Sequence, residues 1–399
     1  MLSKQMEKNM ANRSAIREVF EYGIELGKKI GPENVFDFSL GNPATPAPEK
    51  FKEAVVNLVQ NEEPMALHGY TDNSGYQDVR QAIAEDLNKR FGTDMDFHNI
   101  VMSVGAAGAL NTVFKCILNP EDEVIFFAPY FSEYVNYISN FYANPVVVKP
   151  NTETFQPDMV EFEAKITAKT KAVIVNSPNN PSGVVYSEET MKSIASILEK
   201  KQKEFNQEIY LISDEPYREL LYDGAKHCFA TNYYDNTFVC YSYSKSLSLP
   251  GERIGYVAFS NKMADAKKME VALKIATRIL GFVNAPSLIQ KAVKECLNEK
   301  TALEYYDTNR QILYNGLTNA GFTCIKPQGA FYIFLKSPIE DDIAFCEKAK
   351  EFNLMIVNGT SFDCPGFARL TYCISKEKIE RSIEQFEKLA AVYGLTPKK

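Results

Sequence analysis

Short apolar runs that alternate with helical segments fill the middle of the chain, and they constrain its fold more than any other feature. The runs are rich in β-branched and aromatic residues, and several lack the polar–apolar alternation of a half-exposed strand. Strands of this kind are covered by helices on both faces, as in parallel sheets. The sequence therefore predicts an α/β fold, with a mostly parallel sheet inside a three-layer α/β/α unit. The predicted strands are residues 99–104, 124–128, 144–148, 172–176, 209–213, 238–242 and 255–259.

The pattern changes near residue 320, where shorter strands and helices follow one another closely. We expect this region to form a smaller α+β unit, joined by a predicted helix at residues 11–31 and a strand at 35–40. A proline-rich connector at residues 41–48 follows that strand. The expected division is residues 48–290 for the large unit, and residues 1–47 with 291–399 for the small one.

Composition and charge argue against several classes of protein. The formal net charge of -7 disfavours a nucleic-acid-binding protein or a basic membrane surface. No apolar run approaches the roughly 18 residues that span a bilayer, and the N-terminus lacks an apolar signal segment. The 8 cysteines form no CxxC pair and the 3 histidines are dispersed, so no metal site is expected. Reduced, buried cysteines in a cytoplasmic protein are the expected state.

Polar side chains follow three of the predicted strands at their carboxyl ends. Asn180 comes after residues 172–176, Asp214 and Tyr217 after 209–213, and Lys245 after 238–242. Ligands bind at this edge of parallel sheets, so we expect these side chains to meet there. A lysine in apolar surroundings has a lowered pKa and can form a Schiff base with an aldehyde.

Two further features suit a phosphate group. Ser242, Ser244 and Arg253 surround Lys245 in sequence and supply hydrogen-bond donors. Residues 105–109 (Gly-Ala-Ala-Gly-Ala) form a small-residue turn between a strand and a helix, where backbone N–H groups and the helix dipole favour an anion. The turn is not GxGxxG and lacks the acidic residue of a dinucleotide site, which disfavours a dehydrogenase.

Together these motifs resemble those of the fold-type I, pyridoxal-phosphate-dependent aminotransferases of class I and II, the group that includes aspartate aminotransferases. The resemblance runs from about residue 11 to 390. The matching motifs are Asn180-Pro-Ser-Gly183, Asp214-x-x-Tyr217, Ser242-x-Ser-Lys245 with Arg253 eight residues on, Gly329-Ala-Phe-Tyr332, and Arg369 before Leu-Thr-Tyr.

The resemblance implies ping-pong transfer of an amino group from an L-amino acid, aspartate or a similar one, to a 2-oxo acid. Lys245 would carry pyridoxal 5'-phosphate and move the proton, and Asp214 would pair with the ring nitrogen. Asn180 and Tyr217 would donate to the 3' oxygen. Phe131, rather than its neighbour Tyr130, would stack on the ring.

The resemblance also assigns the two anions. Arg369 would grip the substrate α-carboxylate in a fork, helped by Asn180 and by the loop of Gly41 and Asn42. Tyr70 would reach the phosphate from a partner subunit, which implies a homodimer with shared sites. The remaining phosphate ligands would be Gly105, Ala106, Ala107, Ser242, Ser244 and Arg253.

Some questions stay open on the sequence. A C–S β-lyase acting on cystathionine-type substrates shares nearly all these motifs, and a non-catalytic effector-binding domain of the same fold is a further alternative. Asn358 stands where the family typically has proline, and we expect it to loosen the loop before Arg369. Arg17 and Arg278 are candidates for a distal carboxylate, and Arg17 lies in an N-terminal helix that could close over the substrate.

Overall fold

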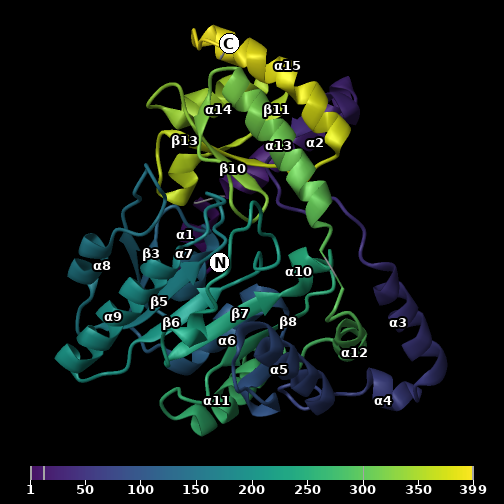
Figure 1. Ribbon diagram of the computed structural model, residues 1–399, viewed down its shortest axis with the longest axis vertical. Helices are drawn as coiled ribbons and strands as arrows, with labels where there is room; N and C mark the ends of the chain where they lie inside the picture. Colours follow the sequence, from purple (N-terminus) through teal and green to yellow (C-terminus); the bar gives the residue numbers. More distant parts are fainter. Residues whose placement is uncertain (1, 12–13, 300, 398–399) are drawn as a thin grey trace.

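The computed structural model describes residues 2–11, 14–299 and 301–397, and its largest element is a seven-stranded sheet (Figure 1). The strand order is β2-β8-β7-β6-β5-β3-β4. All neighbouring pairs from β7 to β4 are parallel, whereas β8 runs antiparallel to both β7 and β2. The bounds are β2 (Ile100–Ser103), β3 (Glu123–Phe127), β4 (Asn144–Val148), β5 (Thr170–Asn176), β6 (Tyr210–Asp214), β7 (Thr237–Ser242) and β8 (Gly255–Phe259).

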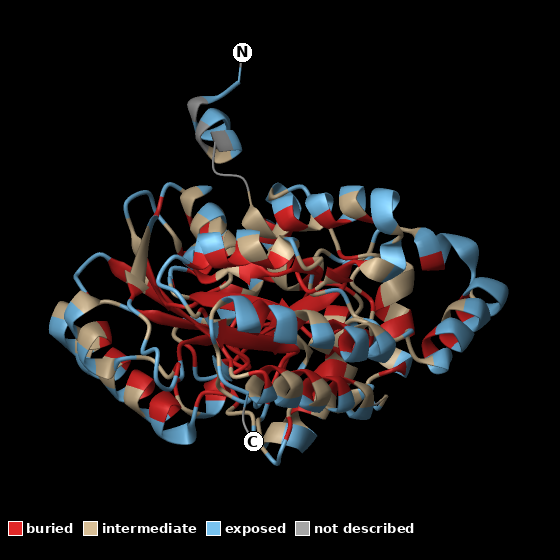
Figure 2. Cartoon of the chain, turned by 90° about the horizontal axis from the view of Figure 1, so that it is seen from above, coloured by how far each residue is buried: buried red, intermediate tan, exposed pale blue. Residues whose placement is uncertain are grey.

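Helices cover both faces of this sheet, so its central strands are almost fully buried, whereas the edge strand β4 is mostly half-buried (Figure 2). Successive residues of one strand pack into different cores: Val101 of β2 faces the cluster that contains Phe114 and Leu273, whereas Ile100 and Met102 face the cluster that contains Leu87. The first face carries α6 (Gly105–Ile117), α7 (Glu133–Ser139) and α11 (Ala266–Ile279). The second face carries α3 (Glu49–Asn61), α4 (Pro64–His68), α5 (Gln77–Phe91), α8 (Met159–Lys165), α9 (Glu188–Phe205) and α12 (Ser287–Glu295). The three predicted layers are present.

The C-terminal elements gather at the top of Figure 1 around a second, antiparallel sheet of order β12-β13-β10-β9. β1 pairs in parallel with β11, so the N-terminal strand joins these elements, as expected. The strands are β1 (Phe36–Asp37), β9 (Thr323–Cys324), β10 (Tyr332–Lys336), β11 (Leu354–Met355), β12 (Val357–Asn358) and β13 (Phe367–Thr371). The helices are α2 (Ala15–Ile30), α13 (Leu303–Asn319), α14 (Asp342–Lys350) and α15 (Lys376–Val392).

Several boundaries differ from those read in the sequence. The helix predicted at residues 11–31 corresponds to α2, which begins after Ser14, while α1 (Lys4–Ala11) precedes it and residues 12 and 13 lie outside the described residues. The first of the short strands expected after residue 320 is β9, which has only two residues. The expected division at residue 290 falls within α12, which packs against α3 and α5. The division into two domains stays a prediction. None of the helices in the described ranges is long and apolar enough to cross a bilayer.

Candidate active site

The direction of the strands brings distant polar residues to one edge of the large sheet. β5, β6 and β7 end at this edge, and in register Asn176 lies beside Asp214. Because β8 is reversed, it begins at the same edge, with Gly255 opposite both Ser242 and Ser103. Arg253, two residues before Gly255, therefore reaches the edge at which the other strands end.

A cavity of about 510 Å³ opens there and collects nearly all the side chains proposed from the sequence. It also takes in residues from the N-terminal and C-terminal segments that pack above the sheet. The predicted site residues that line it are Gly41, Ala106, Ala107, Phe131, Asn180, Asp214, Tyr217, Ser242, Ser244, Lys245, Arg253 and Arg369. Gly105 adjoins the cavity through Arg253, whereas Tyr70 does not line it and is 90% exposed.

Lys245 lies on α10 (Tyr243–Ser246), a single helical turn that directly follows β7, rather than on the strand itself. Its Nζ donates a 2.6 Å hydrogen bond to the carbonyl oxygen of Gly41 and lies 5.5 Å from the centre of the Phe331 ring. Burial lowers the pKa of the Lys245 amine to about 8. A lysine of this kind is partly neutral near physiological pH, which suits a nucleophile or a general base.

Asp214, the last residue of β6, is buried and half satisfied. Its Oδ2 accepts a 2.6 Å hydrogen bond from the hydroxyl of Tyr134, while Oδ1 is buried with no hydrogen-bond partner among the described residues. Burial raises the pKa of the Asp214 carboxyl to about 7; the Tyr134 hydrogen bond acts against this rise and the charge of Glu215 adds to it. An unpartnered carboxylate oxygen is costly, so a donor from a bound molecule fits this position.

The N-terminus of α6 forms an anion-binding corner with Arg253. Within the described ranges no side chain caps α6, so its first backbone N–H groups are available to a ligand. Arg253 donates from Nη2 to the carbonyl of Val104 (3.1 Å) and from Nη1 to that of Pro250 (2.8 Å). A Cβ on Gly105, whose φ is +76°, would lie 2.6 Å from Arg253 Nη2, so only glycine leaves the guanidinium in place. The Ser242 and Ser244 hydroxyl oxygens lie 2.7 Å apart beside it.

Arg369 of β13 is buried with one N–H group unsatisfied. Nη1 donates to Asn180 Oδ1 at 3.1 Å and Nη2 donates to the carbonyl of Ser39, whereas Nε has no partner among the described residues. The guanidinium lies between the rings of Tyr332 and Phe362, at 4.8 and 5.0 Å. Burial lowers the pKa of Arg369. A carboxylate that enters the cavity would satisfy Nε and offset the cost of burying the charge.

Three residues received no role from sequence reasoning: Tyr332 and Asn176, which line the cavity, and Tyr134, which lies outside its lining. The Tyr332 hydroxyl lies 2.8 Å from that of Tyr217, although the motif that ends at Tyr332 was recognised without a role for this residue. Asn176 donates from Nδ2 to the Asp214 backbone carbonyl and accepts from the Asn180 N–H, which fixes that loop. Tyr134 stands three positions after Phe131, but nothing in its local sequence indicates that it contacts Asp214.

Two of the remaining sequence interpretations can be compared with the structure. Arg17 lines the cavity together with Ser14 and Ile16 of the same N-terminal segment, whereas Arg278 is exposed on α11 and does not line it. The expectation that Asn358 loosens its loop is wrong. The Asn358 side chain accepts hydrogen bonds from the Ser361 N–H and hydroxyl, at 3.0 and 2.7 Å, and so caps the next helical turn.

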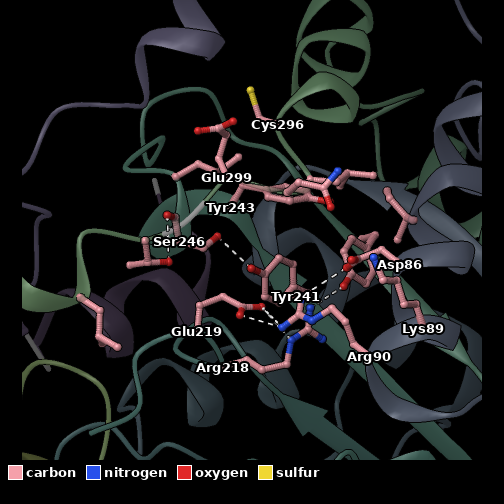
Figure 3. A pocket seen from close by; sticks show the side chains of 17 residues that line it. Asp86, Lys89, Arg90, Arg218, Glu219, Tyr241, Tyr243, Ser246, Cys296 and Glu299 are labelled. Atoms are coloured by element: carbon pink, nitrogen blue, oxygen red, sulfur yellow. Dashed lines mark hydrogen bonds and ion pairs between the residues drawn. The ribbon is translucent and has the colours of Figure 1, made fainter.

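A second cavity, of about 430 Å³, lies on the other side of α10 and is shown in Figure 3. Three of its charged side chains form one hydrogen-bonded cluster: Arg90 Nη2 donates to both oxygens of Glu219, and Arg218 Nε donates to one of them. Tyr241 donates to the hydroxyl of Ser246 at 2.8 Å. The unsatisfied groups of the first cavity make that one the candidate site. Among the described residues no cluster of three metal-ligating side chains occurs.

The chain as a whole is similar to known proteins. The sequence profile of "Aminotransferase class I and II" matches residues 33–386. The chain is 31% identical to the aspartate aminotransferase of Thermotoga maritima, over 89% of this chain and 91% of the relative. It is also 31% identical to the aspartate/prephenate aminotransferase of Thermus thermophilus, over 88% and 89% of the two chains.

Solved structures share the whole fold. An amino transferase from Eubacterium rectale superposes with a TM-score of 0.96 at 48% identity, covering 99% of both chains. The Thermus thermophilus aspartate aminotransferase with maleate superposes with a TM-score of 0.87 at 28% identity, covering 98% of this chain and 99% of the other. The α/β fold predicted from the sequence is thereby confirmed.

Proposed function

Because the chain belongs to the class I and II aminotransferases and is thus an aminotransferase, we propose that it uses pyridoxal 5'-phosphate to move an amino group from aspartate, or a similar L-amino acid, to a 2-oxo acid. The observation that carries the proposal is one cavity shared by a buried lysine amine, an unpartnered oxygen of Asp214 and an arginine with an unpartnered N–H group. These groups match the aldehyde, the ring nitrogen and the substrate carboxylate that such a reaction brings together.

The residues present fit this cofactor. Asp214 Oδ1 would accept a hydrogen bond from the N–H of the protonated ring, and Phe131 would lie against the ring. Asn180 and Tyr217 would hold the ring's 3' oxygen. The phosphate would be held by the N–H groups at Gly105, Ala106 and Ala107, with Ser242, Ser244 and Arg253. When bound, pyridoxal phosphate supplies an aldehyde for the amine and a conjugated ring that withdraws electrons from the substrate Cα.

The chain's own residues then bind the amino acid and move its proton. Arg369, with Asn180 beside it, would bind the α-carboxylate through Nε and fix the direction of the Cα–H bond. Lys245 Nζ would remove that proton, because burial leaves the amine partly neutral near pH 8. Asp214 would hold the proton on the ring nitrogen and keep it there during turnover.

The choice of donor rests on the distal end of the cavity. Relatives of this chain include aspartate aminotransferases, and Arg17 lines the cavity with a side chain that makes no hydrogen bond or ion pair to any other described residue. We assign Arg17 to the distal carboxylate of an acidic substrate. Arg278 is not assigned this role, because it lies outside the cavity lining.

A homodimer would complete the site, since Tyr70 is exposed and does not line the cavity of its own chain. We propose that Tyr70 of the partner subunit reaches the phosphate, and we place the enzyme in the cytoplasm, where its buried thiols, such as Cys240 and Cys364, stay reduced. Hybrid dimers of Lys245→Ala and Tyr70→Ala chains, isolated with two tags, test the sharing. One site of each hybrid is then intact, and roughly half of the wild-type activity is expected. If Tyr70 instead contacts the phosphate of its own chain, no site of the hybrid is intact, and its activity should be no higher than that of the Tyr70→Ala homodimer.

The first experiment is borohydride reduction of the purified protein, followed by peptide mass spectrometry. A pyridoxyl group on Lys245 is the expected result, and its absence after addition of pyridoxal phosphate would overturn the proposal. A panel of amino donors and oxo-acid acceptors then identifies the substrates. The lyase alternative is tested in the same panel, because a lyase releases pyruvate and ammonia from cystathionine with no oxo-acid acceptor.

A further inference from the structure

Tyr134 makes the one hydrogen bond to the Asp214 carboxylate within the part of the chain that the structure describes. The hydroxyl donates to Asp214 Oδ2 at 2.6 Å, from α7 to the end of β6, across 80 positions of sequence. Both side chains are buried, so water does not compete for the bond. Oδ1 is left as the oxygen available to a bound molecule.

The Tyr134 ring is fixed by aromatic neighbours and cannot easily turn away. It packs edge-on against Phe126 and Phe131, with ring centres 5.8 and 5.7 Å apart, and parallel to Tyr130 at 6.4 Å. Phe131, the residue assigned to the ring of the cofactor, therefore packs against the same side chain that fixes the Asp214 carboxylate. A donor fixed in this way selects the plane of the carboxylate and the oxygen that stays unpartnered.

The hydrogen bond also opposes the loss of charge that burial imposes on Asp214. Burial and the charge of Glu215 raise the pKa of this carboxyl, and the Tyr134 hydroxyl acts in the opposite direction. The other titratable groups nearby are Tyr217 on the same loop, Tyr137 on α7 and Cys240 on β7. Each of these three stays neutral near pH 7, because its own pKa is raised by burial. Tyr134 is thus the group that favours the carboxylate.

We propose that Tyr134 is a positioning residue for the cofactor: its hydroxyl orients Asp214 and keeps it anionic, so that Oδ1 can accept the N–H of the pyridine ring. The inference rests on the proposed use of pyridoxal phosphate. It assigns Tyr134 no contact with the substrate and no transfer of a proton during turnover. Its effect reaches the reaction only through the charge and orientation of Asp214.

Tyr134→Phe removes the hydroxyl and leaves the ring in place. Tyr130→Phe is the matched control, because Tyr130 is also buried, stacks on Tyr134, and donates a hydrogen bond from its hydroxyl to Asp363 at 2.8 Å instead. Two quantities are measured for each: the dissociation constant of pyridoxal phosphate from the cofactor-free protein, and the pH midpoint at which the visible absorption of the holoenzyme changes.

We expect Tyr134→Phe to bind the cofactor about tenfold to a hundredfold more weakly, the effect of losing a hydrogen bond to a charged group. The absorption midpoint should rise by about one pH unit. The reason is that the positive charge of the protonated ring disfavours a second proton on the nitrogen that joins Lys245 to the cofactor. Weaker protonation of the ring therefore raises the pKa of that nitrogen. Tyr130→Phe should match the wild type in both. A Tyr134→Phe protein with the wild-type affinity for pyridoxal phosphate and the wild-type absorption midpoint would contradict the inference.

A double-mutant comparison separates this role from general packing. In an Asp214→Ala background, adding Tyr134→Phe should move the midpoint no further, because the group that Tyr134 acts on is gone. Additive effects would contradict the inference. Should Tyr134→Phe fail to fold, Tyr134→3-fluorotyrosine, a stronger donor of the same shape, should lower the midpoint, and an unchanged value would count against the inference. If the wild type binds no pyridoxal phosphate, the proposed function itself fails.

Discussion

The Lys245 amine donates a 2.6 Å hydrogen bond to the carbonyl oxygen of Gly41, 204 positions earlier in the chain. Two residues before Gly41, the carbonyl of Ser39 accepts from Arg369. A single short loop therefore contacts both the lysine and the arginine assigned to the substrate carboxylate.

Replacing the lysine tests the chemistry most directly. Lys245→Ala should lower the transamination rate by at least about four orders of magnitude, because both the covalent link and the general base are lost. Circular dichroism should show an unchanged fold. The exposed Lys262→Ala serves as the control and should keep full activity. Transamination by the Lys245→Ala enzyme near the wild-type rate would remove Lys245 from its assigned role.

The buried carboxyl of Asp214 should make the stability of the cofactor-free protein depend on pH. Its pKa is raised from 3.8 to about 7 in the fold. Because the pKa is higher in the folded state, the folded protein binds this proton more tightly than the unfolded chain does. The free energy of unfolding therefore falls as the pH rises from about 4 to about 7. Asp214→Asn should therefore be more stable than the wild type at pH 8, by up to a few kcal/mol. The difference should vanish near pH 4.

Urea unfolding of the cofactor-free proteins at several pH values measures this difference. The exposed Asp94→Asn is the control for a carboxylate outside the site. A wild-type protein that equals or exceeds Asp214→Asn in stability at pH 8 would show that the carboxyl carries its charge there without cost.

The hydrogen-bonding geometry of the Arg369 guanidinium can be tested separately from its positive charge. Arg369→Ala should raise the KM for the amino donor by about tenfold to a hundredfold, as expected for a lost charge-assisted hydrogen bond. Arg369→Lys keeps the charge but cannot match the geometry of Nε, and it should restore only part of the loss. Steady-state kinetics with the preferred donor provide the values. A KM unaffected by Arg369→Ala would place the carboxylate elsewhere.

Arg17 should decide between acidic and neutral substrates. Arg17→Ala should lower kcat/KM for aspartate by about tenfold and leave that for alanine nearly unchanged, because only the former has a distal carboxylate. Arg278→Ala is the matched control, since Arg278 is an exposed arginine outside the cavity. Equal losses for both donors would assign Arg17 a structural role instead.

Gly41 leaves no room for a side chain. A Cβ at this position would overlap the hydroxyl of Tyr332 and lie 3.1 Å from an edge atom of Phe331. Gly41→Ala should therefore displace the carbonyl that Lys245 contacts and reduce activity at least about tenfold. Removing the overlapping hydroxyl in Gly41→Ala/Tyr332→Phe should recover part of this loss. Tyr332→Phe alone serves as the control for loss of the hydroxyl. If the double variant is no more active than Gly41→Ala, the clash is not with that hydroxyl.

The sequence predicted the layers of the fold because helical and strand periodicity are local properties. Residues 172–175 and 209–212 are all aliphatic or aromatic, and the structure buries both strands completely apart from one residue near the start of β5. The direction of the strands near the edge of the sheet could not be predicted from the sequence. The reversal of β8, which brings Arg253 to the site, depends on how a strand pairs with distant neighbours and not on its own residues.

The same distinction applies within the site. Lys245, Asp214 and Arg369 stand in local motifs, so their identities could be read from the chain alone. The Tyr134–Asp214 and Tyr217–Tyr332 contacts join residues 80 and 115 positions apart. Such contacts follow from strand order, register and the packing of buried rings. The sequence by itself therefore determined which groups we propose for the chemistry, whereas only the tertiary structure decided which of their atoms remain unpartnered, because that depends on every neighbour that folding brings within hydrogen-bonding distance.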